Sequence, residues 1–212
     1  MILYLIRHGQ SVANEKGIIQ GRKDFPLSDL GQNQVKLLGE YFASESIDYL
    51  YASDLTRALD TANAIGDRLP LNTIKWDKIR EIGLGPLEGK TKNEIYLQYP
   101  QLNDSNSILT TGLAGTELVP EITERCKYVL DQLLSGHKRH RVALVSHGGF
   151  ISIFLMYLMV AEKWNDFHRP FVINNTGISK IEFSENKKPV FRYINNTTHL
   201  LTSDTKIENI NY

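Results

Sequence analysis

The sequence predicts a three-layer α/β/α sandwich with a mostly parallel central sheet. Strand-like and helix-like patterns alternate along the chain, as they do when helices cover both faces of a parallel sheet. The strand expected at 142–146 starts with an unbroken run of four apolar residues, as in strands that are buried on both faces. The 212 residues are 42% hydrophobic, enough for a full core. No repeat or flexible linker divides them, so we expect a single domain over residues 1–212.

The first half of the chain contains three expected strands and two expected helices. Short apolar runs mark the strands, and apolar residues three or four positions apart mark the helices. Ser28 is placed to cap the first helix. The elements are, in order, a strand at 2–7, a helix after Ser28, a strand at 47–53, a helix with an apolar face over 55–69, and a short strand at 71–76.

The second half begins with a helix that Thr91 and Glu94 open in the form of a capping box. Next come a striped helix over 122–133, the strand 142–146 and an apolar helix at 150–161. Two late strands, 177–183 and 190–194, are spaced to pair with each other. The tail after about residue 198 shows little pattern, so it is a candidate for a mobile segment.

Charge and cysteine content exclude several classes of protein. The 24 basic and 24 acidic residues balance, so no overall field favours nucleic acid or an anionic membrane. The single Cys126 rules out an internal disulfide.

The N-terminal apolar stretch is short and ends at Arg7, unlike a signal peptide, and the run 150–161 is too short to cross a bilayer of about 30 Å. The default expectation is a cytoplasmic protein, and a homodimer is compatible with the sequence.

Arg7 and His8 are the first candidate functional residues. They follow the strand 2–7, and the carboxyl ends of strands are where open α/β sheets bind ligands. Gly9 lets the backbone approach a ligand closely, and Ser11 and Asn14 add hydrogen-bonding groups. A cation beside an imidazole suits a phosphoryl group. The alternative is a strand-end pair with no role.

Arg57 lies in the first turn of the helix after the strand 47–53. It is about 200° around the helix from Leu55, away from the apolar stripe. A cation is unfavourable at this end of a helix, and a bound phosphate would resolve the conflict. The alternative is a solvated surface arginine.

Two further segments place ionisable side chains after strands. The loop 80–89 carries Glu81 and Glu88, either of which could act as general acid and then as base; the alternative is two solvated charges. His147 follows the strand 142–146 and precedes Gly148 and Gly149, so backbone N–H groups at a helix start form an anion site beside it. A structural histidine is the alternative there. The polar turn 174–177 is a weaker signal.

A zinc site is the competing interpretation, because two histidines and a glutamate can hold a catalytic zinc ion. The sequence has no His-x-His or His-x-x-x-His spacing, and Arg7 and Arg57 would repel a dication from the same pocket. We therefore expect neither a metal nor another cofactor.

Taken together, these segments resemble the histidine phosphatase superfamily, in the branch of cofactor-dependent phosphoglycerate mutases and broad-specificity phosphatases. The sequence departs from the family pattern at two positions. Gln10 stands where glutamate is commoner, which is a mild change, and Leu87 stands where an aromatic residue is common, which we expect to alter the pocket wall. The matching segments occur in the family's order: Arg7-His8-Gly9-Gln10, Asn14, Gln20-Gly21, Pro26-Leu27-Ser28, Ser53-Asp54-Leu55 with Arg57-Ala58, Glu81, Glu88-Gly89 and Ser146-His147-Gly148.

The resemblance implies a role for each matched residue. His8 is the implied nucleophile, which forms a phosphohistidine, and Glu81 is the implied proton donor. Arg7, Arg57 and His147 are implied to hold the phosphoryl oxygens. The other residues implied to line the phosphate pocket are Asn14, Gln20, Gly21, Gly148 and, less directly, Thr176.

Within that branch the sequence favours a phosphatase that acts on small phosphomonoesters. Residues 93–115, which we expect to cover the pocket, contain no lysine or arginine, whereas a mutase must hold a second phosphate. The alternatives are a bisphosphate-dependent phosphoglycerate mutase and a protein that binds phosphorylated ligands without turnover. Specificity is expected to reside in residues 98–115, whose polar side chains suit sugars, phosphoglycerates, phosphoserine or a nucleotide-like ester.

Overall fold

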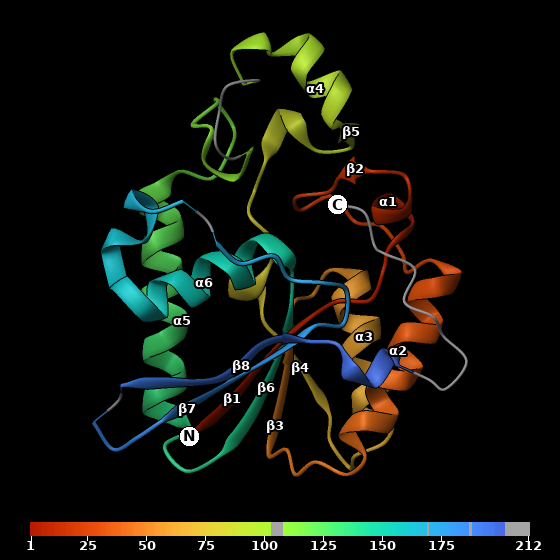
Figure 1. The fold of residues 1–212 in the computed structure, drawn as a ribbon, viewed down its shortest axis with the longest axis vertical. Coiled ribbons are helices and arrows are strands. Elements are labelled where there is room, and N and C mark those ends of the chain that lie inside the picture. Colours follow the sequence, from red (N-terminus) through yellow and green to blue (C-terminus); the bar gives the residue numbers. More distant parts are fainter. Residues whose placement is uncertain (103–107, 169, 187, 202–212) are drawn as a thin grey trace.

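The computed structural model describes residues 1–102, 108–168, 170–186 and 188–201, and a six-stranded sheet lies at its centre (Figure 1). The strand order is β4-β3-β6-β1-β7-β8. The first four strands in this order pair in parallel, and β7 pairs antiparallel with both β1 and β8. Their bounds are β1 Ile2–Arg7, β3 Tyr49–Ala52, β4 Thr73–Lys75, β6 Arg141–Ser146, β7 Ile178–Phe183 and β8 Pro189–Asn196. The prediction of a mostly parallel α/β sheet is confirmed, although the strands expected at 47–53 and 71–76 are shorter.

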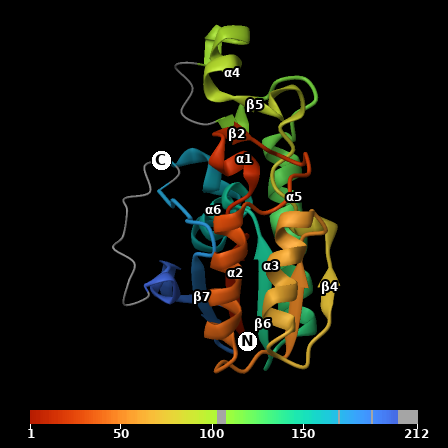
Figure 2. The same ribbon diagram turned by 90° about the vertical axis from the view of Figure 1, so that its right-hand side faces the viewer.

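Helices cover both faces of this sheet. On one face lie α2 (Asp29–Phe42) and α3 (Thr56–Gly66), side by side in Figure 2, and on the other lie α5 (Val119–Gly136) and α6 (Gly148–Val160). The alternation of β1 explains the two cores. Tyr4 and Ile6 pack in the core that contains α2 and α3 residues. Leu3 and Leu5 pack in the core that contains α5 and α6 residues.

The helix starts follow the capping signals of the sequence. The Ser28 hydroxyl accepts a hydrogen bond from Gly31 N at 3.1 Å at the start of α2. Thr91 and Glu94 form the expected capping box of α4 (Lys92–Gln98). Helix α6 is apolar almost all round and lies largely in the core, as expected for a buried helix. No helix in the described ranges is long and apolar enough to cross a membrane.

Several short elements lie beyond the carboxyl ends of the parallel strands. Ser11 caps helix α1 (Val12–Glu15), and β2 (Ile18–Ile19) pairs antiparallel with β5 (Lys90–Thr91). These segments are too short for a periodic pattern to show in the sequence. The 3-10 turns are η1 Asp77–Ile79, η2 Gly85–Leu87, η3 Pro100–Leu102, η4 Ile108–Thr110, η5 Ala161–Asp166 and η6 Thr198–Leu200. The expected mobile tail falls mostly on residues 202–212, outside the described residues.

Candidate active site

The candidate residues meet at the carboxyl ends of the parallel strands. Arg7 ends β1 and His8 follows it, Arg57 lies in the first turn after β3, and His147 follows β6. His8, Arg57 and His147 are each at most 2% exposed. Glu81 comes from the loop after β4. The structure therefore gathers residues that are far apart in the sequence at one buried place, as the parallel topology predicts.

His8 is fixed in a single tautomer. Its Nδ1 lies 2.6 Å from the carbonyl oxygen of Gly9, and because a carbonyl can only accept, Nδ1 carries the hydrogen. The lone pair is then on Nε2. Burial lowers the pKa of His8 well below its usual value, and the cations of Arg57 and Arg7 lower it further. The ring is therefore neutral near pH 7, with one nitrogen able to act as a nucleophile.

The backbone around His8 is held from several sides. His8 N donates to Ser146 O at 2.9 Å, and Thr176 N donates to the carbonyl oxygens of Arg7 and His8. Asn175 Nδ2 donates to His8 O at 3.0 Å. Gly9 N donates to the Thr61 hydroxyl at 3.0 Å. Thr61 was not expected from the sequence, because a threonine within a helix carries no local signal for such a contact.

His147 lies next to His8, with 5.1 Å between the ring centres. Its Nε2 lies 2.8 Å from the hydroxyl oxygen of Ser53, and Leu55 N donates to that same oxygen at 3.4 Å. Burial is the main cause that lowers the pKa of His147 well below its usual value, followed by the charge of Arg57. Within the described part of the chain, its buried Nδ1 has no hydrogen-bond partner.

Arg57 is buried, so the alternative of a solvated surface arginine is wrong. Its Nη2 donates to Gly21 O at 2.8 Å and its Nη1 to Lys23 O at 3.0 Å. Burial lowers the pKa of Arg57 to about 10, while the carboxylates of Glu81 and Asp24 act to raise it. The guanidinium therefore stays a cation at neutral pH. A second cation enters from β1, since Arg7 Nη1 donates to Ile173 O at 2.6 Å.

Glu81 lies at the start of α6. Its Oε2 accepts from Gly149 N at 3.0 Å, and its Oε1 accepts from Phe150 N at 2.8 Å and from Ile82 N at 3.0 Å. The anion site that the sequence predicts at this helix start thus holds the Glu81 carboxylate in this structure. Gly148 lies against the Arg7 side chain, because a Cβ atom there would lie 3.2 Å from Arg7 Nε.

The Glu88 side chain accepts hydrogen bonds from the backbone of its own loop, 80–89, and from a neighbouring segment. Its Oε1 accepts from Arg22 N at 2.9 Å and from Leu84 N at 2.8 Å. Gly21 is required beside it, because φ is +52° there and a Cβ atom would lie 2.3 Å from Glu88 Oε1. Glu88 therefore joins the Gln20–Gly21 segment to the loop that carries Glu81.

Asn14 and Gln20, two further predicted pocket residues, both contact the Ser11 side chain. The Ser11 hydroxyl lies 3.0 Å from Asn14 Oδ1 and 2.8 Å from Gln20 Oε1. An amide whose oxygen is engaged in this way presents its nitrogen as a donor. Thr176, with φ +55°, supports the site through its backbone, and its hydroxyl donates to Asn175 O at 2.8 Å.

The chain belongs to the histidine phosphatase superfamily. The family model described as "Histidine phosphatase superfamily (branch 1)" matches residues 3–197. Among curated relatives, the "Putative phosphoserine phosphatase 2" of Hydrogenobacter thermophilus is 32% identical, over 93% of this chain and 96% of the relative. The "Probable phosphoglycerate mutase GpmB" of Yersinia enterocolitica is 28% identical, over 86% of this chain and 85% of the relative.

Solved structures show the same fold. A mutant phosphoserine phosphatase from Entamoeba histolytica, in complex with phosphoserine, is 27% identical with a TM-score of 0.75; the match covers 94% of this chain and 99% of that one. YhfR of Bacillus stearothermophilus has a TM-score of 0.82 at 24% identity, over 94% and 99% of the two chains. The similarity to phosphoglycerate mutase-like proteins that the sequence predicts is therefore confirmed at the level of fold and family.

Proposed function

We propose that this protein is a metal-independent phosphatase that hydrolyses small phosphomonoesters through a phosphohistidine on His8. The observation that carries the proposal is the buried, neutral His8, whose Nδ1–H is bound to Gly9 O. Arg7, Arg57 and His147 lie around it as groups that can bind phosphoryl oxygens. Phosphoryl transfer depends mainly on positioning and charge stabilisation, and these residues supply both.

In the first step, His8 Nε2 attacks the phosphorus atom of the ester. The N–P bond forms while the bond between phosphorus and the leaving oxygen breaks. Glu81, in its acid form, gives its proton to that oxygen, so that an alcohol departs. Arg7 and Arg57 neutralise the phosphoryl oxygens, and Nδ1 of His147 is available to donate to one of them if Nε2 accepts from Ser53.

In the second step, water attacks the phosphohistidine. The Glu81 carboxylate takes a proton from that water as its oxygen bonds to phosphorus, and the N–P bond breaks. Inorganic phosphate leaves and neutral His8 is restored. The same carboxyl group thus acts as acid and then as base.

The sequence over the pocket favours hydrolysis over mutase activity. Residues 93–115 contain no lysine or arginine, and the described turn Ile108–Thr110 places Leu109 close to Gly149 and Glu81. A mutase must retain a bisphosphate intermediate, which requires cations around its second phosphate. Because a relative carries the name of a mutase, mutase activity is the alternative to be tested.

Phosphoserine is the first substrate to test. The relative at 32% identity carries the name of a phosphoserine phosphatase. Solved structures at 27% identity hold phosphoserine in one case and 3-phosphoglyceric acid in another. Both ligands are small phosphomonoesters with a carboxylate, which makes this chemical class the leading candidate.

The test measures phosphate release from phosphoserine, phosphoglycerates, sugar phosphates and nucleoside monophosphates, with and without a chelator. We expect release that the chelator leaves unchanged. Interconversion of 2- and 3-phosphoglycerate that depends on bisphosphate would instead identify a mutase. Binding of these esters with neither reaction would identify a non-catalytic protein.

A further inference from the structure

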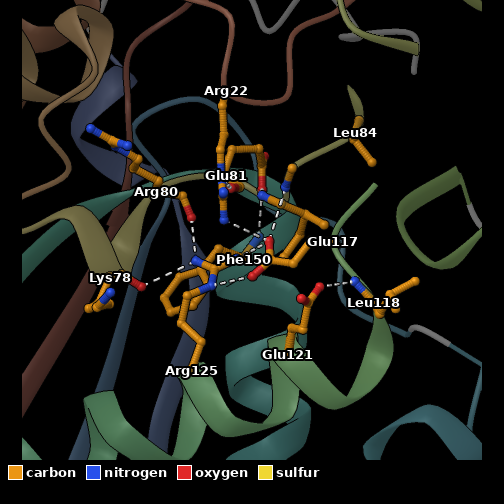
Figure 3. A network of polar contacts seen from close by, with 12 residues as sticks. Arg22, Lys78, Arg80, Glu81, Leu84, Glu117, Leu118, Glu121, Arg125 and Phe150 are labelled. Atoms are coloured by element: carbon orange, nitrogen blue, oxygen red, sulfur yellow. Dashed lines mark hydrogen bonds and ion pairs between the residues drawn. The ribbon is translucent and has the colours of Figure 1, made fainter. Parts of the chain in front are cut away.

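A network of ion pairs, built around a nearly buried pair, lies beside the loop that carries Glu81 (Figure 3). Arg125 binds Glu117 with two hydrogen bonds, Nε to Oε1 at 2.7 Å and Nη2 to Oε2 at 2.8 Å. Both side chains are only 8% exposed. Arg22, which is 42% exposed, adds a third contact from Nη2 to Glu117 Oε2 at 3.0 Å. No feature of the proposed chemical steps uses these three side chains.

The network binds the backbone on both sides of Glu81. Arg125 Nη1 donates to Arg80 O at 2.7 Å and to Lys78 O at 3.2 Å, before Glu81. Glu117 Oε2 accepts from Gly83 N at 3.0 Å, after Glu81. Arg22 Nε donates to Glu81 O at 3.4 Å. The path of the main chain through Glu81 is therefore set by charged side chains from other segments.

The same network reaches the helix end that orients the Glu81 carboxylate. The Arg125 guanidinium lies over the Phe150 ring, 4.7 Å from its centre, and Phe150 N donates to Glu81 Oε1. Arg22 directly follows Gly21, whose carbonyl oxygen binds Arg57. One group of side chains thus links the expected proton donor to the expected phosphate clamp.

We propose that Glu117, Arg125 and Arg22 are positioning residues that set the place of Glu81 for proton transfer. This inference rests on the proposed function. A buried ion pair is weak evidence for a gain in stability, because desolvation offsets much of the attraction. Its fixed geometry, in contrast, matters for a proton transfer, where a shift of about 1 Å can lower the rate about 100-fold.

The experiment compares substrates with different leaving groups, so that a misplaced proton donor can be told apart from a general loss of activity. An aryl phosphate departs as a weakly basic phenolate and needs little protonation, whereas an alkyl phosphate needs the proton. We expect Glu117→Gln and Arg22→Ala to slow alkyl phosphate cleavage by about 10-fold or more while aryl cleavage changes by less than about threefold. Arg22→Ala keeps the buried pair, so it tests the inference even if Glu117→Gln fails to fold. Glu182→Gln, which breaks the exposed Arg192–Glu182 pair, is the matched control and should change neither rate.

The same changes are then made in a Glu81→Gln background. If Glu117 and Arg22 act through Glu81, their selective effect on alkyl phosphates disappears there. Equal slowing of both substrates, or a selective effect that persists without Glu81, would overturn the positioning role. Failure of the proposed function gives a different result, because Glu81→Gln alone would then slow both substrates equally or the unaltered protein would release no phosphate.

Discussion

His147 is linked to Ser53 by a buried hydrogen bond of 2.8 Å between its Nε2 and the serine hydroxyl. The bond joins the ends of β3 and β6, which are neighbouring strands. Leu55 N also donates to the same serine oxygen, and we expect the hydroxyl hydrogen to point to Nε2 of His147. The imidazole hydrogen then resides on Nδ1, which makes that nitrogen a donor to a bound anion.

Ser53→Ala should therefore impair catalysis more than it impairs folding. Loss of one buried hydrogen bond is worth about 1 kcal/mol, and loss of the preferred tautomer should lower kcat/KM for phosphoserine about 10-fold. Ser152→Ala is the matched control, because Ser152 is an equally buried serine that donates to Phe171 O. Steady-state kinetics measure the loss of catalysis and thermal unfolding measures the loss of stability, so the two effects can be compared in each variant. Equal kcat/KM values in both variants would contradict the role of Ser53.

His8→Ala should abolish covalent labelling by substrate phosphate. Without the imidazole there is no N–P bond to form, although Arg7, Arg57 and His147 remain to bind phosphate. The measurement is acid-quenched labelling with a ³²P-labelled phosphomonoester. His137→Ala serves as the control, because His137 is also buried but follows α5 and precedes β6, at the opposite edge of the sheet. Label that persists in His8→Ala would rule out His8 as the nucleophile.

Arg57→Lys should fail to replace the native side chain, even though the charge is kept. The guanidinium bonds to Gly21 O and Lys23 O at once, and a lysine ammonium cannot hold this planar geometry while also binding phosphate. We expect kcat/KM to fall about 100-fold. Arg68→Lys is the control, since Arg68 is exposed and pairs with Glu40 at 3.8 Å. Activity within twofold of the unaltered protein in Arg57→Lys would remove Arg57 from the phosphate clamp.

Much of this site could be predicted because the strand topology fixes where strand ends meet. Arg7 ends a strand that the apolar pattern marks. His8, Arg57 and His147 each come soon after such a strand, so the convergence of these residues follows from a parallel sheet. Glu81 was harder to place. The sequence indicates an anion site at the start of α6 but cannot tell which anion fills it, and the structure brings the Glu81 carboxylate there.

The supporting contacts could not be predicted, because they depend on tertiary packing. Thr61 is one of several polar residues in α3, and only the fold brings its hydroxyl to Gly9 N. Glu117 lies two residues before α5 and Arg125 lies within it. They are eight residues apart, which is no standard helical pairing distance. Their contact arises because the chain before α5 turns back toward the loop of Glu81.

Because His8 and His147 are buried, we predict that the free energy of unfolding decreases in acid. The pKa values of His8 and His147 lie well below normal in the folded protein, while in the unfolded chain both are near 6.5. Above about pH 6.5 these two histidines leave the free energy of unfolding unchanged. Below that pH the free energy of unfolding decreases, because only the unfolded state then takes up protons.

Between pH 6.5 and pH 5.5 each imidazole should lower the free energy of unfolding by about 1 kcal/mol. Urea unfolding at several pH values measures this dependence in the unaltered protein and in a His8→Asn, His147→Asn double variant. Carboxylates and the other histidines titrate alike in both proteins, so the difference between the two curves isolates the buried pair. We expect the double variant to lose about 2 kcal/mol less over this interval. Parallel curves would mean that the two rings can be protonated in the folded protein, which would contradict a neutral nucleophile at His8.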